Sequence, residues 1–196
     1  MGSDKGLLKL EANTWAQTAV DKLSILGIPV KLSVNRQQLN DYAKVFAADD
    51  LFVDAASLEL HGPLLGVLST HLQLNTEDLF VFACDMPLME PILIKELSAA
   101  YKQNPGYDAY VFMNDHEPEP LCAIYTAKGL AVIFDMLQNG SLTRHSMKFM
   151  LDHIEFKAAQ QPSGLRAVTR DGHQIAVPHQ ELLQQPADAF VIVNDQ

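Results

Sequence analysis

An aspartate that ends an apolar run is the residue of this sequence with the clearest potential for chemistry. Asp85 directly follows the continuous apolar stretch 79–84, and Pro87 comes two residues later. Such a run is typical of a strand buried on both faces, and ligands of open α/β sheets bind at the carboxyl ends of strands. Asp85 could therefore hold a divalent metal on a phosphate substrate, because hard cations take oxygen ligands. An aspartate that merely begins a turn or caps the next helix explains this stretch equally well.

Two glycine-containing segments could contact a phosphate or another polar ligand edge. Lys5 stands beside Gly6 near the start, where an ammonium and bare backbone N–H groups could approach phosphate oxygens. Gly62 and Pro63 open a predicted helix, whose first N–H groups could receive an anion. A solvated turn and a plain loop-to-helix transition are the more frequent explanations of the two patterns.

The segment 114–120 also contains potential ligands, because it holds one histidine, three acidic residues and two prolines. Its spacing matches no closed zinc pattern, and the prolines indicate a rigid surface loop. We therefore expect no metal there.

The elements around these residues alternate between helices and strands. Thr14 is a plausible N-cap of a first helix that ends before Gly27, and Leu64, Leu68 and Leu72 are expected to share one face of a later helix. The pattern predicts helices over 14–26, 39–46, from 63 onward, 91–102, 130–137 and 143–151. It predicts strands over 29–34, 51–53, 79–84, 108–113, 121–125 and 189–193, with a hairpin-like region over 166–177. This order implies right-handed crossovers and a mostly parallel sheet.

Composition narrows the class of protein. The 196 residues are 48% hydrophobic with a formal charge of −10, which favours a single globular domain over 1–196 and argues against a nucleic-acid binder. A nucleotide substrate remains compatible with this charge. Cys84 and Cys122 lie in apolar runs and no signal peptide is evident, so we expect buried thiols in the cytoplasm. No stretch is long enough to span a membrane.

Taken in order, these signals resemble the molybdenum cofactor guanylyltransferase family along essentially the whole chain. The segments that carry the resemblance are 4–8, 34–36, 53–54, 62–66, 84–87, 119–121 and 189–194. The resemblance implies a three-layer α/β fold of the Rossmann-like nucleotidyltransferase type, with helices on both faces of the sheet. It also implies an enzyme that transfers GMP from GTP to molybdopterin-bound molybdenum cofactor and releases pyrophosphate.

Residue roles follow from the same resemblance. It implies a nucleotide site made of Lys5, Ser33, Asn35, Asp54, Gly62, Pro63, Gly66 and Asp85. Lys5 would neutralise GTP phosphates, Asp54 would lie by the guanine and ribose, and Asp85 would hold Mg²⁺ against the α-phosphate. Catalysis would then be positioning plus electrostatics, without a covalent protein intermediate. The residues implied on the pterin side are Glu119, Pro120 and Asn194.

The chain also departs from the family. The family begins with a strand and a glycine-rich phosphate loop before the segment that here starts at Met1. We expect another segment to fill that central position of the sheet, or the chain to pair with a second copy, because unpaired strand edges are unfavourable. Ser33 and Ile192 stand where the family often has asparagine, and the chain ends at Gln196 where relatives continue into a helix.

Two alternatives to a guanylyltransferase remain open. One is a sister transferase that uses CTP or another small acceptor, and the other is a catalytically silent protein that binds the pterin or a partner. The expected partners are GTP and molybdenum cofactor as substrates, with a homo-oligomer or a cofactor-delivery protein also possible and no nucleic acid or membrane.

Overall fold

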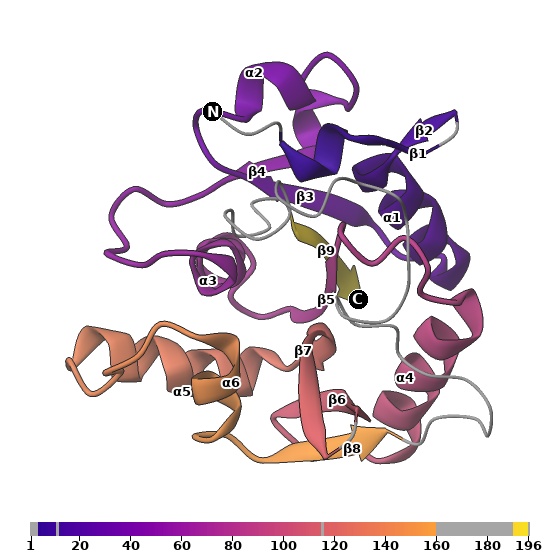
Figure 1. The fold of residues 1–196 in the computed structure, drawn as a ribbon. Coiled ribbons are helices and arrows are strands. Elements are labelled where there is room, and N and C mark those ends of the chain that lie inside the picture. Colours follow the sequence, from indigo (N-terminus) through magenta and orange to yellow (C-terminus); the bar gives the residue numbers. More distant parts are fainter. Residues whose placement is uncertain (1–3, 11, 115, 160–189, 196) are drawn as a thin grey trace.

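The computed structural model describes residues 4–10, 12–114, 116–159 and 190–195 (Figure 1). Its centre is a seven-stranded sheet in the order β4-β3-β9-β5-β7-β6-β8. The strands are β3 (Val30–Val34), β4 (Leu51–Val53), β5 (Asp78–Ala83), β6 (Ala109–Asn114), β7 (Glu117–Tyr125), β8 (Phe156–Ala159) and β9 (Phe190–Asp195). Strands β3, β4, β5, β6 and β8 point the same way, whereas β7 and β9 run against their neighbours. By strand direction the sheet is mostly parallel, as the sequence predicted.

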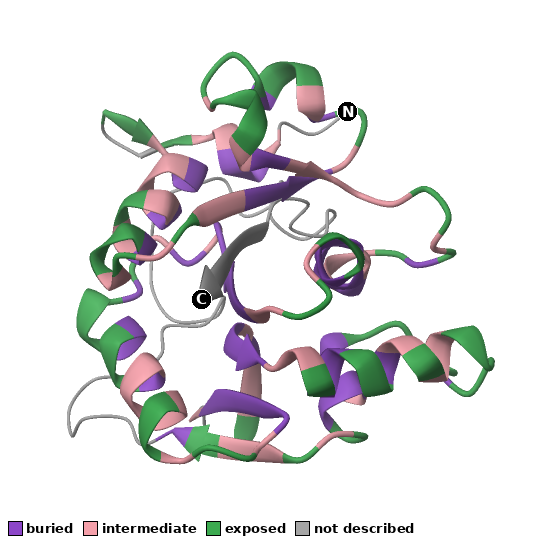
Figure 2. Cartoon of the chain, turned by 180° about the vertical axis from the view of Figure 1, so that it is seen from behind, coloured by how far each residue is buried: buried purple, intermediate pink, exposed green. Residues whose placement is uncertain are grey.

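Helices cover both faces of this sheet (Figure 1). One face carries α1 (Trp15–Leu23) and α4 (Pro91–Gln103), and the other carries α3 (Pro63–Gln73), α5 (Ala127–Gln138) and α6 (Met147–Leu151). The buried sides of the helices face the strands (Figure 2). The remaining short elements are η1 (Lys5–Leu7), η2 (Ser24–Leu26), α2 (Leu39–Tyr42), η3 (Ala48–Asp50) and the small hairpin β1 (Lys9–Leu10) with β2 (Asn13–Thr14). Within the described ranges, no helix combines the length and apolar character needed to cross a bilayer.

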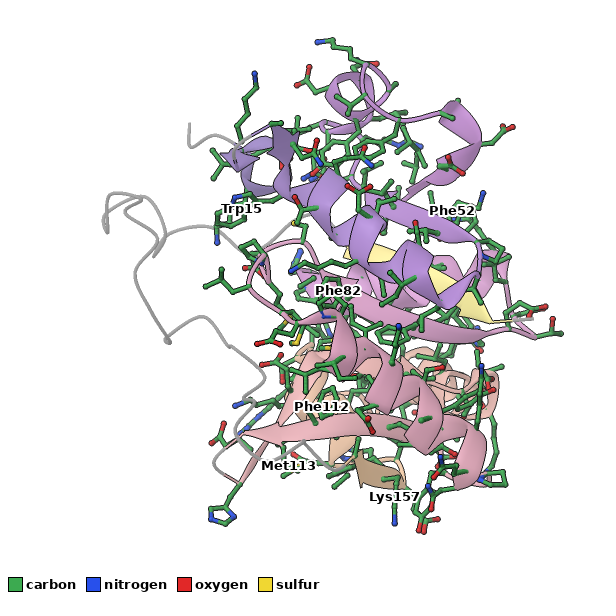
Figure 3. All side chains as sticks on the ribbon, turned by 90° about the vertical axis from the view of Figure 1, so that its right-hand side faces the viewer. Trp15, Phe52, Phe82, Phe112, Met113 and Lys157 are labelled. Atoms are coloured by element: carbon green, nitrogen blue, oxygen red, sulfur yellow. The ribbon has the colours of Figure 1, made fainter. Side chains whose placement is uncertain are left out.

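Strand β5 contributes to two separate cores, which confirms the three-layer arrangement. Phe80 and Phe82 lie in the core under α1 and α4, and Figure 3 shows Phe82 inside this layer. Leu79 and Val81 lie in the core under α3, α5 and α6. Because successive side chains of a strand point to opposite faces, a continuous apolar run is what a strand covered on both sides requires.

The predicted boundaries of the first helix agree with local hydrogen bonding, whereas the helices predicted over 39–46 and 143–151 are shorter, because α2 ends at Tyr42 and α6 begins at Met147. The Thr14 hydroxyl accepts from the Gln17 N–H at 3.1 Å and caps α1, and Gly27 follows η2 in the left-handed conformation with φ 70°. The expected common face of α3 is wrong at Leu72, which is 41% exposed. The buried stripe of this helix instead follows the spacing i, i+3, i+4 and i+7, through Leu64, Val67, Leu68 and His71.

Strand β9 occupies the position between β3 and β5. It pairs antiparallel with Val30–Ser33 on one side and with Asp78–Ala83 on the other. This pairing confirms the expectation that another segment completes the middle of the sheet. It also supplies backbone partners to two strand edges that would otherwise be unpaired.

The surface loop expected over 114–120 is wrong, because most of it belongs to the long strand β7. Residues Glu117–Glu119 pair antiparallel with Phe112–Asn114 after a short turn in which His116 has φ 74°. Strand β7 pairs with β5 only from Cys122 onward, so the edge facing β5 carries no ladder along 117–121. Prolines, which lack the N–H that a ladder needs, are tolerated at such an unpaired edge. The hairpin predicted over 166–177 lies outside the described residues.

Candidate active site

The carboxyl ends of β3, β4 and β5 lie along one edge of the sheet. Ser33 and Ala83 both pair with the same residue of β9, so β3 and β5 end at nearly the same level. Asp54 follows β4, and its N–H donates to the carbonyl of Val34 in β3 at 2.9 Å. Asp85 lies two residues beyond the end of β5. Polar residues that are 31 positions apart in the chain are thereby brought to one edge, where α/β sheets bind ligands.

The N-terminal segment is fixed to this edge by one carboxylate. Asp4 accepts hydrogen bonds from the Gly6 N–H at 2.8 Å, the Gln38 Nε2 at 2.6 Å and the Tyr42 hydroxyl at 3.0 Å. The following residue, Lys5, is only 7% exposed. Three hydrogen bonds to one ionised group are a strong local anchor, because charge-assisted bonds are stronger than neutral ones. They hold the η1 turn, and with it the Lys5 backbone, in one place.

Three charged residues lie near the carboxyl end of β5. Burial raises the pKa of the Cys84 thiol, the carboxylates of Asp85 and Asp4 raise it further, and the Lys5 ammonium lowers it. A charge changes a neighbour's pKa in this way only from close by. The charged cluster of Lys5, Asp4 and Asp85 therefore lies in the neighbourhood of Cys84, which is buried and not in a disulfide.

Glu119 of β7 also lies toward the carboxyl end of β5. Because Cys122 pairs with Phe82, the preceding residues of β7 extend past the carboxyl end of β5. Burial raises the pKa of Glu119 and the Asp85 charge raises it further, against the opposing effects of the Leu121 N–H and the Lys148 ammonium. Two neighbouring carboxylates repel each other when both are ionised. Mg²⁺ binds through one or two carboxylates together with substrate phosphates and water, so Asp85 could hold it even though no group of three or more potential metal ligands gathers among the described residues.

The Asp54 carboxylate lies apart from this cluster, beyond β3. The buried Ser33 hydroxyl donates to Asp54 Oδ1 at 2.7 Å, so one oxygen of Asp54 is held in a fixed direction. Burial raises the pKa of Asp54, and the hydrogen bond from Ser33 partly opposes that effect. The next backbone N–H, that of Ala55, donates to the Ser69 hydroxyl of α3 at 2.8 Å. These contacts connect the end of β4 to α3.

The start of α3 confirms the prediction that Gly62 and Pro63 open a helix. Gly62 has φ 67° and ψ −154°, and Pro63 occupies the first turn. Since α3 ends a few residues before β5 begins, its first turn lies toward the carboxyl end of β5. Gly66, expected to bind nucleotide, lies one turn into the helix and is buried.

Three other predicted site residues make local contacts of their own or lie elsewhere in the sheet. Asn35 uses its side chain locally, because Oδ1 accepts from the N–H groups of Gln37 and Gln38 at 2.8 and 3.0 Å. Pro120 is buried, and its carbonyl accepts from the Tyr125 hydroxyl at 2.8 Å. The backbone of Asn194 pairs with Leu79 at the amino end of β5, at the opposite edge of the sheet from Asp85. The structure therefore does not bring Asn194 together with Glu119.

Comparison with known proteins decides the family. The model of the MobA-like NTP transferase domain matches residues 1–154. The chain belongs to this family. A probable molybdenum cofactor guanylyltransferase of Geobacillus sp. (strain WCH70) is 26% identical over 174 residues, covering 83% of this chain and 88% of the relative. Another, of Methanosarcina mazei, is 29% identical over 160 residues, covering 78% of this chain and 69% of the relative.

A solved structure supports the fold. The molybdopterin-guanine dinucleotide biosynthesis protein A from Archaeoglobus fulgidus superposes with a TM-score of 0.58 at 18% identity, covering 78% of this chain and 72% of that one. The predicted family, the three-layer nucleotidyltransferase fold and the transferase class of enzyme are thus confirmed.

Sequence reasoning missed the residues that hold the N-terminal segment of this MobA-like NTP transferase. Gln38 and Tyr42 both reach Asp4, across 34 and 38 positions of the chain. Their spacing of four residues places them on one face of a helix, which is a signal that the sequence contains. Nothing in the sequence indicates that the partner of that face is Asp4.

Proposed function

We propose that this protein transfers GMP from GTP to molybdopterin-bound molybdenum cofactor in a Mg²⁺-dependent reaction. The observation that carries the proposal is the placement of Lys5 and Asp85 near the carboxyl end of β5, with Asp54 separated from them at the same edge of the sheet. Strands β4 and β5 are separated by β3 and β9, which corresponds to three strand spacings or about 14 Å. That separation allows one nucleotide to place its base near Asp54 and its phosphates near Asp85.

Each residue then has a physical task. Asp54 offers carboxylate oxygens to the N1–H and amino group of guanine, while Ser33 fixes the direction of one of them. Lys5 brings a positive charge to the phosphates from a buried position. Asp85 would hold Mg²⁺, which would supply positive charge against the α-phosphate, and Glu119 would face the pterin substrate.

The reaction needs no covalent protein intermediate. A phosphate oxygen of the acceptor forms a bond to the α-phosphorus of GTP, the bond from that phosphorus to the bridging oxygen breaks, and pyrophosphate leaves with the electron pair. The protein contributes by aligning the two substrates and by offsetting the negative charge, which are the principal sources of catalysis in phosphate transfer.

Calorimetric titration and a transfer assay together test the proposal. GTP and then CTP are titrated with and without Mg²⁺, and α-labelled GTP is incubated with molybdenum cofactor to detect the guanine dinucleotide product. We expect Mg²⁺-dependent binding that favours GTP, and product formation. Preference for CTP would overturn the choice of nucleotide, and binding without product would overturn the transfer reaction.

Asp85→Ala is the decisive variant, and Asp135→Ala is its control. Asp135 is an exposed carboxylate on α5, so its removal changes the net charge equally without touching the cluster. We expect Asp85→Ala to lower the transfer rate by on the order of 10²-fold or more, because it removes the anchor of the metal. Equal losses in both variants would show that Asp85 has no special role.

A further inference from the structure

Lys22 of α1 contacts the backbone of the loop that carries Asp85. Its ammonium donates to the carbonyl oxygens of Pro87 and Met89, the latter at 2.7 Å. These residues are 65 and 67 positions away in the chain. The side chain is half-buried, and burial lowers its pKa. Both carbonyls belong to the connection between β5 and α4, outside either element.

Two further anchors hold the same loop. The side chains of Met86 and Met89 are buried in the core beneath α1 and α4. The Met89 N–H donates to the Met86 carbonyl at 3.1 Å, and the Met86 N–H donates to the Ala83 carbonyl at 3.4 Å. The last of these bonds is long, so the backbone turn alone fixes the loop weakly. Lys22 adds two charge-assisted bonds just beyond Asp85, where the loop has no strand or helix ladder.

We propose that Lys22 is a positioning residue that holds loop 84–90 in the shape that presents Asp85 to the metal and the α-phosphate. The link to catalysis rests on the function proposed above. Two of the three ammonium donors are engaged with the loop, which makes Lys22 part of its support. A replacement for Lys22 must bring hydrogen-bond donors that reach both carbonyls.

The functional test compares Lys22→Met, Lys22→Arg and the control Lys95→Met. Methionine keeps the apolar stem and loses the donors, whereas arginine retains donors for two carbonyls. Lys95 is exposed on α4 and lies outside the cluster. We expect Lys22→Met to lower kcat about 10- to 100-fold and to raise the Mg²⁺ concentration needed for GTP binding, because small displacements of a catalytic group have effects of this size. Lys22→Arg should restore much of the loss, and Lys95→Met should resemble the unaltered protein.

Amide hydrogen exchange tests the loop itself, without any need for activity. In Lys22→Met, exchange should become faster in peptides covering 84–90 and stay unchanged in β3 and β4. Unchanged exchange in 84–90 would overturn the proposal that Lys22 holds the loop. Faster exchange with unaltered kcat and Mg²⁺ dependence would overturn its positioning role. If the unaltered protein transferred no nucleotide, the proposed function would fail, and the exchange result would still decide whether Lys22 holds the loop.

Discussion

Replacing Gly62 by alanine tests whether backbone conformation shapes the nucleotide site. With φ 67° and ψ −154°, Gly62 lies in a region of backbone space that is essentially restricted to glycine. A Cβ added there would meet no atom within 4 Å apart from its immediate chain neighbours, so crowding against the rest of the protein adds nothing to the cost of the substitution. The expected penalty is therefore the backbone strain alone, about 2–3 kcal/mol of unfolding free energy.

Gly27 provides an internal comparison for that magnitude. It also has positive φ and an open Cβ position, but its φ of 70° and ψ of 23° lie in the left-handed helical region. Alanine can adopt this region at a cost of about 1 kcal/mol. The two substitutions thus have the same chemistry and open surroundings, and they differ in the backbone region required. Gly62→Ala should destabilise the protein more than Gly27→Ala by about 1–2 kcal/mol.

Urea unfolding and GTP titration of the two variants measure this difference. Gly62 precedes the first turn of α3, and its carbonyl accepts from the Leu65 N–H at 3.1 Å. If the backbone relaxes to relieve strain, the start of α3 moves and GTP binds more weakly. If it does not relax, the full loss of stability is measured. A Gly62→Ala protein that is as stable as Gly27→Ala and also binds GTP normally would refute the reasoning.

Two further predictions concern packing and charge. Gly129→Ala places a Cβ 2.5 Å from the Asp108 carbonyl oxygen. Although alanine favours helices, the free energy of unfolding measured in urea titrations should therefore fall by about 1–3 kcal/mol. Unchanged or higher stability would contradict this packing. Burial raises the pKa of Asp54, so its favourable contribution is complete below about pH 4 and is lost as the pH rises through its folded-state pKa. In urea titrations, the stability of Asp54→Asn relative to the unaltered protein should therefore increase between pH 4 and pH 7. The same substitution should weaken GTP binding. A stability difference that is independent of pH would show that burial does not disfavour the charged form of Asp54.

Local signals predicted much of this fold, and contacts between distant segments account for what was missed. The apolar run before Asp85 predicted a strand buried on both faces, because such a strand must be apolar throughout. Residues 114–120 were predicted to form a loop because their prolines disfavour strands. The structure permits these prolines because this part of β7 does not pair with β5, and that depends on the register of β7. In the same way, the spacing of Gln38 and Tyr42 was visible, but their contact with Asp4 depends on how the N-terminal segment docks.

The two carboxylate regions of the site, at Asp54 and at Asp85, are held by different contacts, but one strand sets their positions relative to each other. Asp54 is held through its side chain by Ser33, whereas the loop of Asp85 is held through its backbone by Lys22. Between them lies β9, which pairs with β3 and β5 together. A slip of β9 by one residue against either strand would shift the level of one carboxylate relative to the other by about 3.3 Å. The distance between the base side and the phosphate side of the proposed nucleotide site is therefore set by the register of a strand that contributes neither carboxylate.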